Sequence, residues 1–196
     1  YITDIVERNK VRNTSELEDL INMVSSSIGS LTNPKKIADT FVSNKKKISQ
    51  ETVKKYLEYL SDSFLVSASY RYDIKGKKYI NSKRKYYFCD NGLRNSLLNF
   101  REQELSHLME NILYNELLFR GYNVDVGIVD VFAKNSEGKR VHKQLEVDFV
   151  VNNGAERVYV QSAFNMPTKE KEKQERRSLI NIADNFRKVI VVKDDI

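Results

Sequence analysis

The sequence has 196 residues, of which 40% are hydrophobic, and this is enough to bury one ordinary core or two small ones. It holds no apolar run of about 18 residues, which excludes a helix that spans a membrane, and its single cysteine excludes an internal disulfide and a cysteine-based zinc cluster. We therefore expect a protein of the reducing cytoplasm with no membrane partner. Because the chain opens on Tyr1 and carries no leader pattern, we expect it to be a piece of a longer protein.

The net charge of +6 is distributed unevenly along the sequence. Residues 1–90 hold 17 Lys and Arg against 11 Asp and Glu, whereas residues 91–196 hold 16 against 16. A solvated surface does not need this asymmetry, so the first half is the candidate for binding a polyanion.

Three helices are predicted in the first half, each from its own start signal. Ser15 and Glu18 form a capping box before an apolar stripe, and Gly29 ends the first helix. Asn33 is the predicted N-cap of the second helix, whose first residue is Pro34. The third helix is predicted to begin after Ser49 and to bury the apolar stripe Val53, Leu57 and Leu60, with its polar side chains outward.

A β-hairpin is predicted next, because two segments rich in aromatic and β-branched residues flank a basic turn that contains Gly76. Three helices followed by a basic hairpin predict a winged helix-turn-helix over residues 14–90. In that arrangement the third helix enters the major groove of DNA and the hairpin lies against the backbone.

The basic residues of this predicted domain fall on its nucleic-acid-contacting elements. From Lys35 to Lys85 there are 14 basic residues against 5 acidic ones. The predicted contacts, with one base reader and otherwise phosphate ligands, are Lys45, Lys46, Lys47, Gln50, Lys54, Lys55, Lys75, Lys77, Lys78, Lys83, Arg84 and Lys85. In one alternative the lysines only keep a small domain soluble, and in another the helices and the tyrosine-rich hairpin bind a protein.

The second half is predicted to be an α/β core. Residues 91–104 are expected to form a connecting helix and residues 105–196 a domain of one helix, three strands, a charged helix and a last strand, with a mixed sheet. The charged helix is expected to be a solvated face. The apolar face of the helix that begins near residue 105 is predicted to consist of Leu105, Leu108, Ile112, Leu113, Leu117 and Leu118.

Two polar residues interrupt consecutive apolar strands of this half. Asp148 lies in "LEVDFVV" and Gln161 in "VYVQSAF". Burying an unpaired carboxylate or amide costs several kcal/mol, and strand alternation makes the two side chains neighbours if their strands share a sheet face. His107 and His142 have no partner at metal-ligand spacing, and Cys89 is expected to be a small core residue.

These residues carry a resemblance to known families. Glu110 on a helix, Asp148 in a strand and Gln161-Ser162-Ala163 in the next strand resemble the PD-(D/E)xK restriction-endonuclease-like superfamily. Nearly the whole chain is similar to the C-terminal region of a prokaryotic AAA+ ATPase family, through the segments "YITDIVERNKVRN", "TVKKYLEYL", "YRYDIKGKKYINSKRKYYFCDNGLRN", "LMENILYNELLFRGYNVDVG", "EVDFVV" and "VYVQSAF".

That resemblance implies an N-terminal ATPase, then a winged helix, then a nuclease-like module of unassigned function. Residues 1–13 would belong to the preceding ATPase part. ATP would bind only in that part, because this chain has no G-x-x-x-x-G-K-[ST] motif. The implied partners are DNA and the chain's own AAA+ domain, through which an oligomer could form.

The resemblance also implies a Mg²⁺ or Mn²⁺ site at Glu110, Asp148 and Gln161, since such sites use hard oxygen ligands. Gln161 offers only a neutral oxygen, and Ala163 stands where the superfamily pattern has lysine. Losing one electrostatic stabiliser of an oxyanion costs about 2.7 to 4 kcal/mol in other enzymes. The sequence gives no reason to choose among the substitute cations Lys143, Lys169 and Arg157.

Each carboxylate also has a structural alternative. Glu110 could pair with Arg120 or Lys143, and Asp148 could accept hydrogen bonds from backbone amides near a sheet edge. Three functions follow: a DNA-associated part of an ATPase whose nuclease-like core is a structural or binding module, an active metal-dependent DNA nuclease, or a module that docks the ATPase or another protein.

Overall fold

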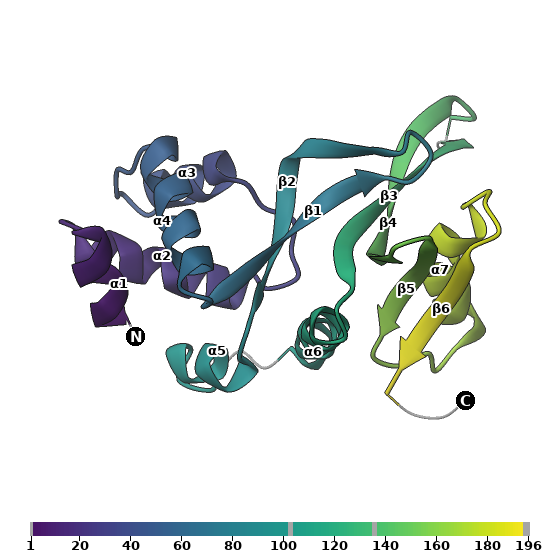
Figure 1. Cartoon of the computed structure of the whole chain (residues 1–196). Coiled ribbons are helices and arrows are strands. Elements are labelled where there is room, and N and C mark those ends of the chain that lie inside the picture. The colour runs from purple at the N-terminus through teal and green to yellow at the C-terminus, as the bar shows by residue number, and fades with distance from the viewer. Residues whose placement is uncertain (1, 102–103, 135–136, 194–196) are drawn as a thin grey trace. The chain divides into compact units, whose positions relative to one another are not determined.

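The computed structural model of the chain describes residues 2–101, 104–134 and 137–193 (Figure 1). It is a mixed α+β structure. Its helices and strands are, in chain order, α1 (Ile2–Asn9), α2 (Thr14–Ser26), α3 (Pro34–Ser43), α4 (Gln50–Asp62), β1 (Val66–Asp73), β2 (Lys78–Phe88), α5 (Asn91–Leu97), α6 (Leu105–Phe119), β3 (Asn123–Lys134), β4 (Arg140–Asn153), β5 (Glu156–Ala163), α7 (Lys169–Ile180) and β6 (Arg187–Val192).

The chain forms two compact units. Unit 1 consists of residues 1–68 and 83–104, and unit 2 of residues 69–82 and 105–196. This division differs from the predicted domains, because the outer part of the β1–β2 hairpin belongs to unit 2. The reason is that β1 pairs in parallel with β3, a pairing that local sequence signals do not reveal.

In unit 1 the predicted helices α3 and α4 are confirmed, together with their caps. Asn33 accepts a hydrogen bond from the Lys36 amide at 2.8 Å, and Ser49 accepts one from the Thr52 amide at 3.0 Å. The capping box at Ser15 is wrong. α2 begins at Thr14, two residues earlier than predicted, so Asn13 takes the N-cap position, without a side-chain capping bond.

Two further helices belong to unit 1. α1 packs against α4 and buries Ile5 completely, so residues 2–9 are an integral part of this unit. α5 packs against α2, where the guanidinium of the buried Arg94 donates through Nε to the Ser25 carbonyl at 2.8 Å. The expectation that Cys89 is a core residue is wrong, because this residue is exposed at the end of β2.

A mixed sheet organises unit 2. Its strand order is β2-β1-β3-β4-β5-β6, and β3 pairs antiparallel with β4, β4 antiparallel with β5, and β5 parallel with β6. A β-bulge interrupts the register between β3 and β4 where Asp125 and Gly127 face β4. The predicted order of helices and strands in the second half, and its mixed sheet, are confirmed.

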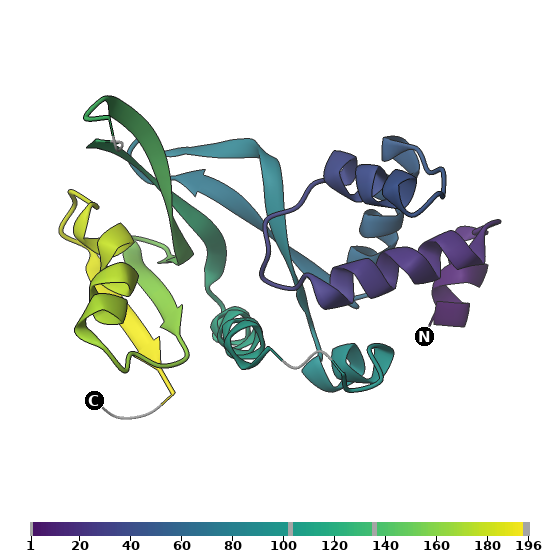
Figure 2. The same ribbon diagram turned by 180° about the vertical axis from the view of Figure 1, so that it is seen from behind.

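Helices α6 and α7 lie on opposite sides of the strands β4 to β6 (Figures 1 and 2). On the α7 side, Leu179 and Ile182 pack with Val150 and Tyr159 in one buried cluster. On the α6 side, the ring of Tyr114 contacts that of Phe149 at a centroid distance of 6.2 Å. None of the described helices has the length and apolar character needed to cross a membrane.

The predicted core face of α6 is wrong. Its buried residues are Glu110, Asn111 and Tyr114, whereas the side chains of several predicted core residues are exposed: Leu105 by 53%, Ile112 by 57% and Leu118 by 38%. Apolar residues occur around nearly the whole circumference of this helix, so the periodicity did not single out the face that packs on the sheet.

Candidate functional site: a fork between two strands

The two central strands of unit 2 separate at one end. β4 and β5 pair from Asn153–Glu156 to Phe149–Val160 and not beyond. Past this point β4 continues its ladder with β3, and β5 continues its ladder with β6 as far as Ala163. We call the place where the ladder between β4 and β5 stops the fork.

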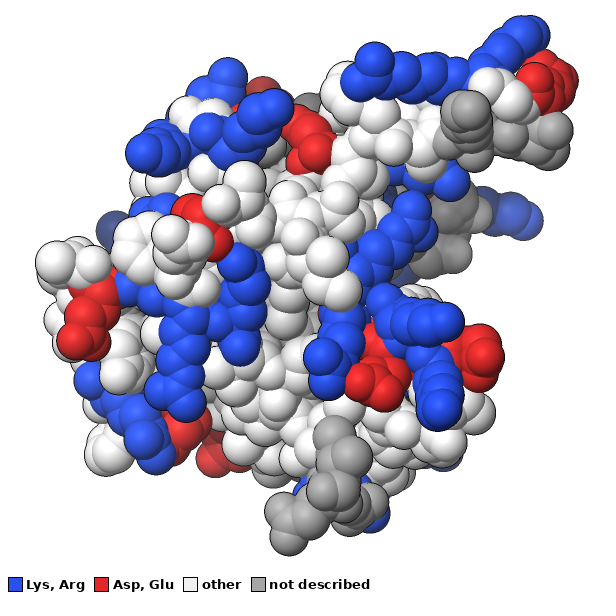
Figure 3. All heavy atoms as spheres, turned by 90° about the vertical axis from the view of Figure 1, so that its right-hand side faces the viewer, with Lys and Arg blue, Asp and Glu red and all other residues white. Residues whose placement is uncertain are grey.

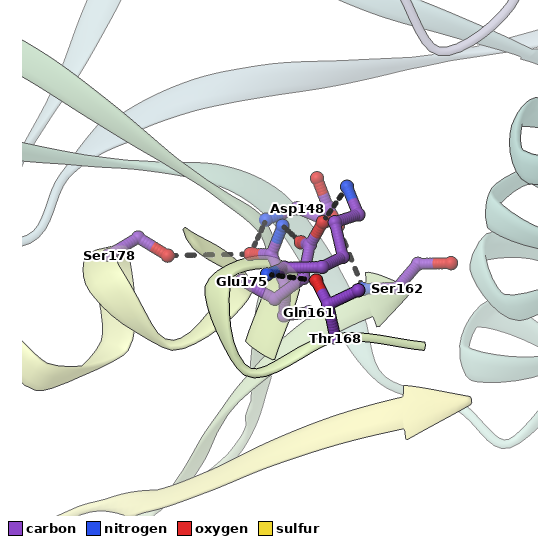
Figure 4. Close-up of polar contacts among 7 residues, drawn as sticks. Asp148, Gln161, Ser162, Thr168, Glu175 and Ser178 are labelled. Carbon is purple, nitrogen blue, oxygen red and sulfur yellow. Dashed lines mark hydrogen bonds and ion pairs between the residues drawn. The ribbon is translucent and has the colours of Figure 1, made fainter. Parts of the chain in front are cut away.

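Side chains replace the missing ladder at the fork (Figure 4). The Ser162 amide donates to Asp148 Oδ2 at 2.8 Å, and the Asp148 amide donates to Gln161 Oε1 at 3.4 Å. Without these bonds two backbone donors would lose their partners where the strands diverge. Asp148 and Gln161 are therefore neighbours, as predicted, and the carboxylate satisfies a backbone amide, as its structural alternative proposed.

Helix α7 completes the network at the fork. Gln161 Nε2 donates to Glu175 Oε2 at 3.4 Å, and the Ser178 hydroxyl donates to Gln161 Oε1 at 3.5 Å. The Glu175 side chain, 12% exposed, also pairs with Lys171, with 2.5 Å between Oε1 and Nζ. We call the residues Asp148, Gln161, Ser162, Lys171, Glu175 and Ser178 the fork network.

Sequence reasoning missed the α7 members of this network. The helix was expected to be a solvated face, but Ser178 is buried and Glu175 is largely covered. Lys171, Glu175 and Ser178 follow one another at spacings of four and three residues, which places them on one helix face. That spacing was the available signal, but the many other charges of α7 concealed it.

Two of the three predicted metal ligands, Asp148 and Gln161, lie at the fork, and the third, Glu110, lies on α6. Ala163 is buried and brings no cation, and the ammonium group at the fork comes from Lys171. Glu110 is buried on the α6 stripe that carries Tyr114, whereas Gln161 binds groups of α7. Among the described residues, no group of three or more His, Cys, Asp and Glu side chains could hold a metal ion.

The three proposed substitute cations lie on three different elements, β5, β4 and α7. Arg157 donates through Nε to Asn152 Oδ1 at 2.8 Å, in the part of β5 that still pairs with β4. Lys143 pairs in register with Val131, and Lys169 is the exposed first residue of α7.

Unit 1 exposes most of its predicted nucleic-acid contacts. Lys45, Lys47, Gln50, Lys55 and Lys83 are exposed. Two further exposed lysines have acidic neighbours: Lys46 pairs with Asp19, and Lys54 lies 3.8 Å from Glu58.

Two predicted contacts on β2 are less accessible. Arg84 is half-buried, and its backbone forms a bridge to Thr32. Lys85 is only 3% exposed, so its prediction as a phosphate ligand is wrong. The physical reason is that residues 85–88 of β2 all run through the interior of unit 1.

The structure also changes the meaning of the charge asymmetry. Lys75, Lys77 and Lys78 are exposed, but they belong to unit 2. Counted by units, the chain holds 15 Lys and Arg against 12 Asp and Glu in unit 1, and 18 against 15 in unit 2. Figure 3 shows Lys and Arg in separate groups with Asp and Glu among them. The predicted contacts are thus divided between two units of equal net charge.

Fold and site together define a mixed α+β protein of two units, with a polar network at a strand fork in the second. The chain belongs to the family described as "Domain of unknown function (DUF8612)", whose model matches residues 1–104. The match covers unit 1 together with the outer part of the hairpin.

Two longer relatives match most of the chain. An uncharacterized protein of Haemophilus influenzae is 35% identical over 190 residues, which are 97% of this chain and 44% of that protein. An uncharacterized protein of Methanocaldococcus jannaschii is 31% identical over 173 residues, which are 88% of this chain and 36% of that protein. The chain therefore spans less than half the length of either relative. No solved structure matches the chain at a significant level.

Proposed function

We propose that this chain is the C-terminal part of a prokaryotic AAA+ ATPase, in which unit 1 binds duplex DNA as a winged helix and unit 2 is a nuclease-like module that does not cleave. Two findings are compatible with a larger parent protein. The sequence resembles the C-terminal region of such ATPases, and more than half of each relative lies outside the matched region.

The exposed face of α4 carries the DNA-binding part of the proposal. Val53, Leu57 and Leu60 are buried on one side of this helix, which leaves Gln50, Lys54 and Lys55 exposed on the other. The acidic neighbour of Lys54 does not prevent this face from binding phosphates. The pair between Lys54 and Glu58 joins two side chains that are more than half exposed, and such a pair contributes about 0 to 1 kcal/mol, so a phosphate can replace it.

The chemistry of this face favours contacts with the DNA backbone. Lysine side chains bind phosphates as point charges, and their contacts fix position without reading sequence. Gln50 alone has the paired donor and acceptor that can recognise an adenine edge. We therefore expect the affinity for DNA to depend strongly on salt concentration and weakly on DNA sequence.

The fork network supports the absence of cleavage. A phosphodiesterase site needs carboxylates that are open to a metal and a cation that is directed at the phosphate. Here Asp148 is engaged by the Ser162 amide, and Lys171 is paired with Glu175. The polar groups at the fork thus bind one another, in an arrangement suited to holding two diverging strands.

A binding titration with a fluorescent duplex tests the proposal. Reversing two charges on α4, in the double variant Lys54→Glu with Lys55→Glu, should weaken duplex binding about tenfold or more at low salt, because two phosphate contacts are lost. Each lost contact should also lower the slope of the logarithm of the association constant against the logarithm of salt concentration by about 0.9. The matched control reverses two exposed charges of α1 and the residue after it, Arg8→Glu with Lys10→Glu. Equal effects of the two double variants would show that net charge, and not the α4 face, determines binding.

A cleavage assay tests the second part. Single-stranded and duplex DNA should remain intact during incubation with the chain and Mg²⁺ or Mn²⁺. Metal-dependent cleavage that disappears in Asp148→Ala would refute the proposal and establish the nuclease alternative.

A further inference from the structure

Unit 2 carries a cluster of aromatic rings and one guanidinium group, which we call the tyrosine surface and define as Tyr70, Tyr72, Tyr79, Arg157 and Phe186. Tyr79 lies 6.4 Å from Tyr70 and 5.5 Å from Tyr72 between ring centroids, edge to face in both pairs. The Arg157 guanidinium lies 5.1 Å from the Tyr72 ring and 5.5 Å from the Phe186 ring. The five side chains form one continuous series, contributed by β1, β2, β5 and the loop before β6.

Hydrogen bonds fix the middle of this series. The Tyr79 hydroxyl donates to Oδ2 of the buried Asp125 at 3.0 Å. Arg157 donates through Nε to Asn152 Oδ1 at 2.8 Å and through Nη2 to the Tyr72 hydroxyl at 3.4 Å. Tyr79 and Arg157 are therefore held in place, and a ligand that binds them has little side-chain entropy to overcome.

The Phe186 end of the series is fixed in the same way. Tyr159, which is fully buried beneath it, donates through its hydroxyl to Asp184 Oδ2 at 2.5 Å, and the other oxygen of Asp184 accepts from the Phe186 amide at 3.2 Å. Burial and the Asp184 hydrogen bond raise the pKa of Tyr159 to about 12, so the phenol stays protonated and keeps this bond throughout the physiological pH range.

These fixed rings are nevertheless uncovered. Tyr79 is 63% exposed, Tyr70 44% and Phe186 42%. A cluster of exposed aromatic side chains, several of whose neighbours are held by hydrogen bonds, is typical of a surface that binds flat, apolar groups.

Three lysines lie close in sequence to Tyr72 and Tyr79 of the tyrosine surface. The turn between β1 and β2 contains Lys75 and Lys77, and Lys78 directly precedes Tyr79. All three are exposed, and the nearby Asp73 carboxylate is occupied by the Gly76 amide at 2.8 Å. A ligand that matches this surface therefore combines planar rings with negative charge.

We propose that the tyrosine surface binds single-stranded nucleic acid, with unpaired bases stacked on Tyr79 and Phe186 and phosphates placed on the lysines of the adjacent turn. Base–aromatic stacking beside a positively charged backbone path is the general mode of single-strand recognition. A duplex keeps its base faces covered, so it cannot use these rings. This site shares no residue with the α4 face of unit 1 and does not depend on it.

The test uses a fluorescent oligothymidylate of about 12 nucleotides, within the range of such sites, and an abasic oligonucleotide of equal length and charge. The protein is the chain with Lys54→Glu and Lys55→Glu, which removes the proposed duplex site, and the unmodified chain is measured in parallel. Phe186→Leu keeps apolar bulk but removes the aromatic ring, whereas Phe186→Trp restores one. Phe119→Leu, at a side chain 88% exposed on α6, is the matched control.

We expect oligothymidylate to bind much more tightly than the abasic strand. Phe186→Leu should weaken oligothymidylate binding by roughly 5-fold to 150-fold, the range given by one lost stacking contact, while Phe186→Trp and Phe119→Leu stay near the parent affinity. Equal binding of the abasic strand, or equal affinity of the Phe186→Leu and Phe119→Leu variants, would overturn the inference. Loss of duplex binding alone would not affect it, because the two sites are tested by different variants.

Discussion

Replacing Asp148 by alanine distinguishes a structural carboxylate from a catalytic one. Asp148 is 7% exposed as a residue, and its carboxylate accepts a hydrogen bond from the Ser162 amide at 2.8 Å, at the point where β4 and β5 stop pairing. In Asp148→Ala this amide keeps its position but loses its acceptor. The bond between the Asp148 amide and Gln161 survives, because it uses the backbone of residue 148.

The expected loss of stability follows from these contacts. A hydrogen bond to a charged group contributes about 1.5 to 3 kcal/mol, and a buried donor left without a partner costs about 1 to 3 kcal/mol. Because the two ranges describe overlapping effects, we expect the free energy of unfolding to fall by about 2 to 4 kcal/mol. Asp148→Asn keeps an oxygen at the same place, and since charge-assisted bonds are roughly twice as strong as neutral ones, we expect about half of that loss.

Urea unfolding of the chain measures both variants, with and without Mg²⁺. The control is Glu116→Ala, which removes a carboxylate whose bond to Arg120 lies at the surface and should change stability by less than about 1 kcal/mol. Catalytic carboxylates repel one another in the absence of metal. If Asp148→Ala proved as stable as the parent chain, and if Mg²⁺ stabilised only the parent, the structural role of this carboxylate would be refuted.

Two further predictions concern the bulge between β3 and β4. A Cβ at Gly127 would lie 2.8 Å from Val150 Cγ2 and 2.9 Å from Val147 Cβ, so Gly127→Ala should destabilise the fold by about 1 to 3 kcal/mol in urea unfolding; a change below about 0.5 kcal/mol would contradict this packing. Burial raises the pKa of Asp125 above its ordinary value, so the folded state binds this proton more tightly than the unfolded state does. The free energy of unfolding should therefore fall as the pH rises from the ordinary pKa of the carboxyl through the raised one. Asp125→Asn, which can still accept a hydrogen bond from Tyr79, should remove that fall. An unchanged pH profile in this variant would contradict the assignment of the fall to Asp125.

Local signals in the sequence predicted the elements that depend on local chemistry. Asn33 and Ser49 were identified as N-caps because each residue needs only the amide three positions ahead. The adjacency of Asp148 and Gln161 followed from strand alternation and the order of the strands. In each case the interacting groups lie within one element or in consecutive strands.

Features that depend on distant parts of the chain were not predictable in this way. The parallel pairing of β1 with β3 brings the outer part of the hairpin into unit 2, although 55 residues separate Ser69 from the Val124 carbonyl that it contacts. The burial of Lys85 follows from the course of residues 85–88 through the interior of unit 1, and the buried face of α6 is set by the sheet on which it packs. Glu175 was missed because its partner, Gln161, lies on another element.

The salt dependence of duplex binding tests the central claim most directly. The association constant of the chain for a fluorescent duplex should fall steeply as salt rises, and the slope of its logarithm against the logarithm of salt should be smaller by about 2 in the variant Lys54→Glu with Lys55→Glu. The Arg8→Glu and Lys10→Glu control should keep the parent slope. Absence of duplex binding, or the same slope for the parent chain and the α4 variant, would contradict the assignment of this face to DNA.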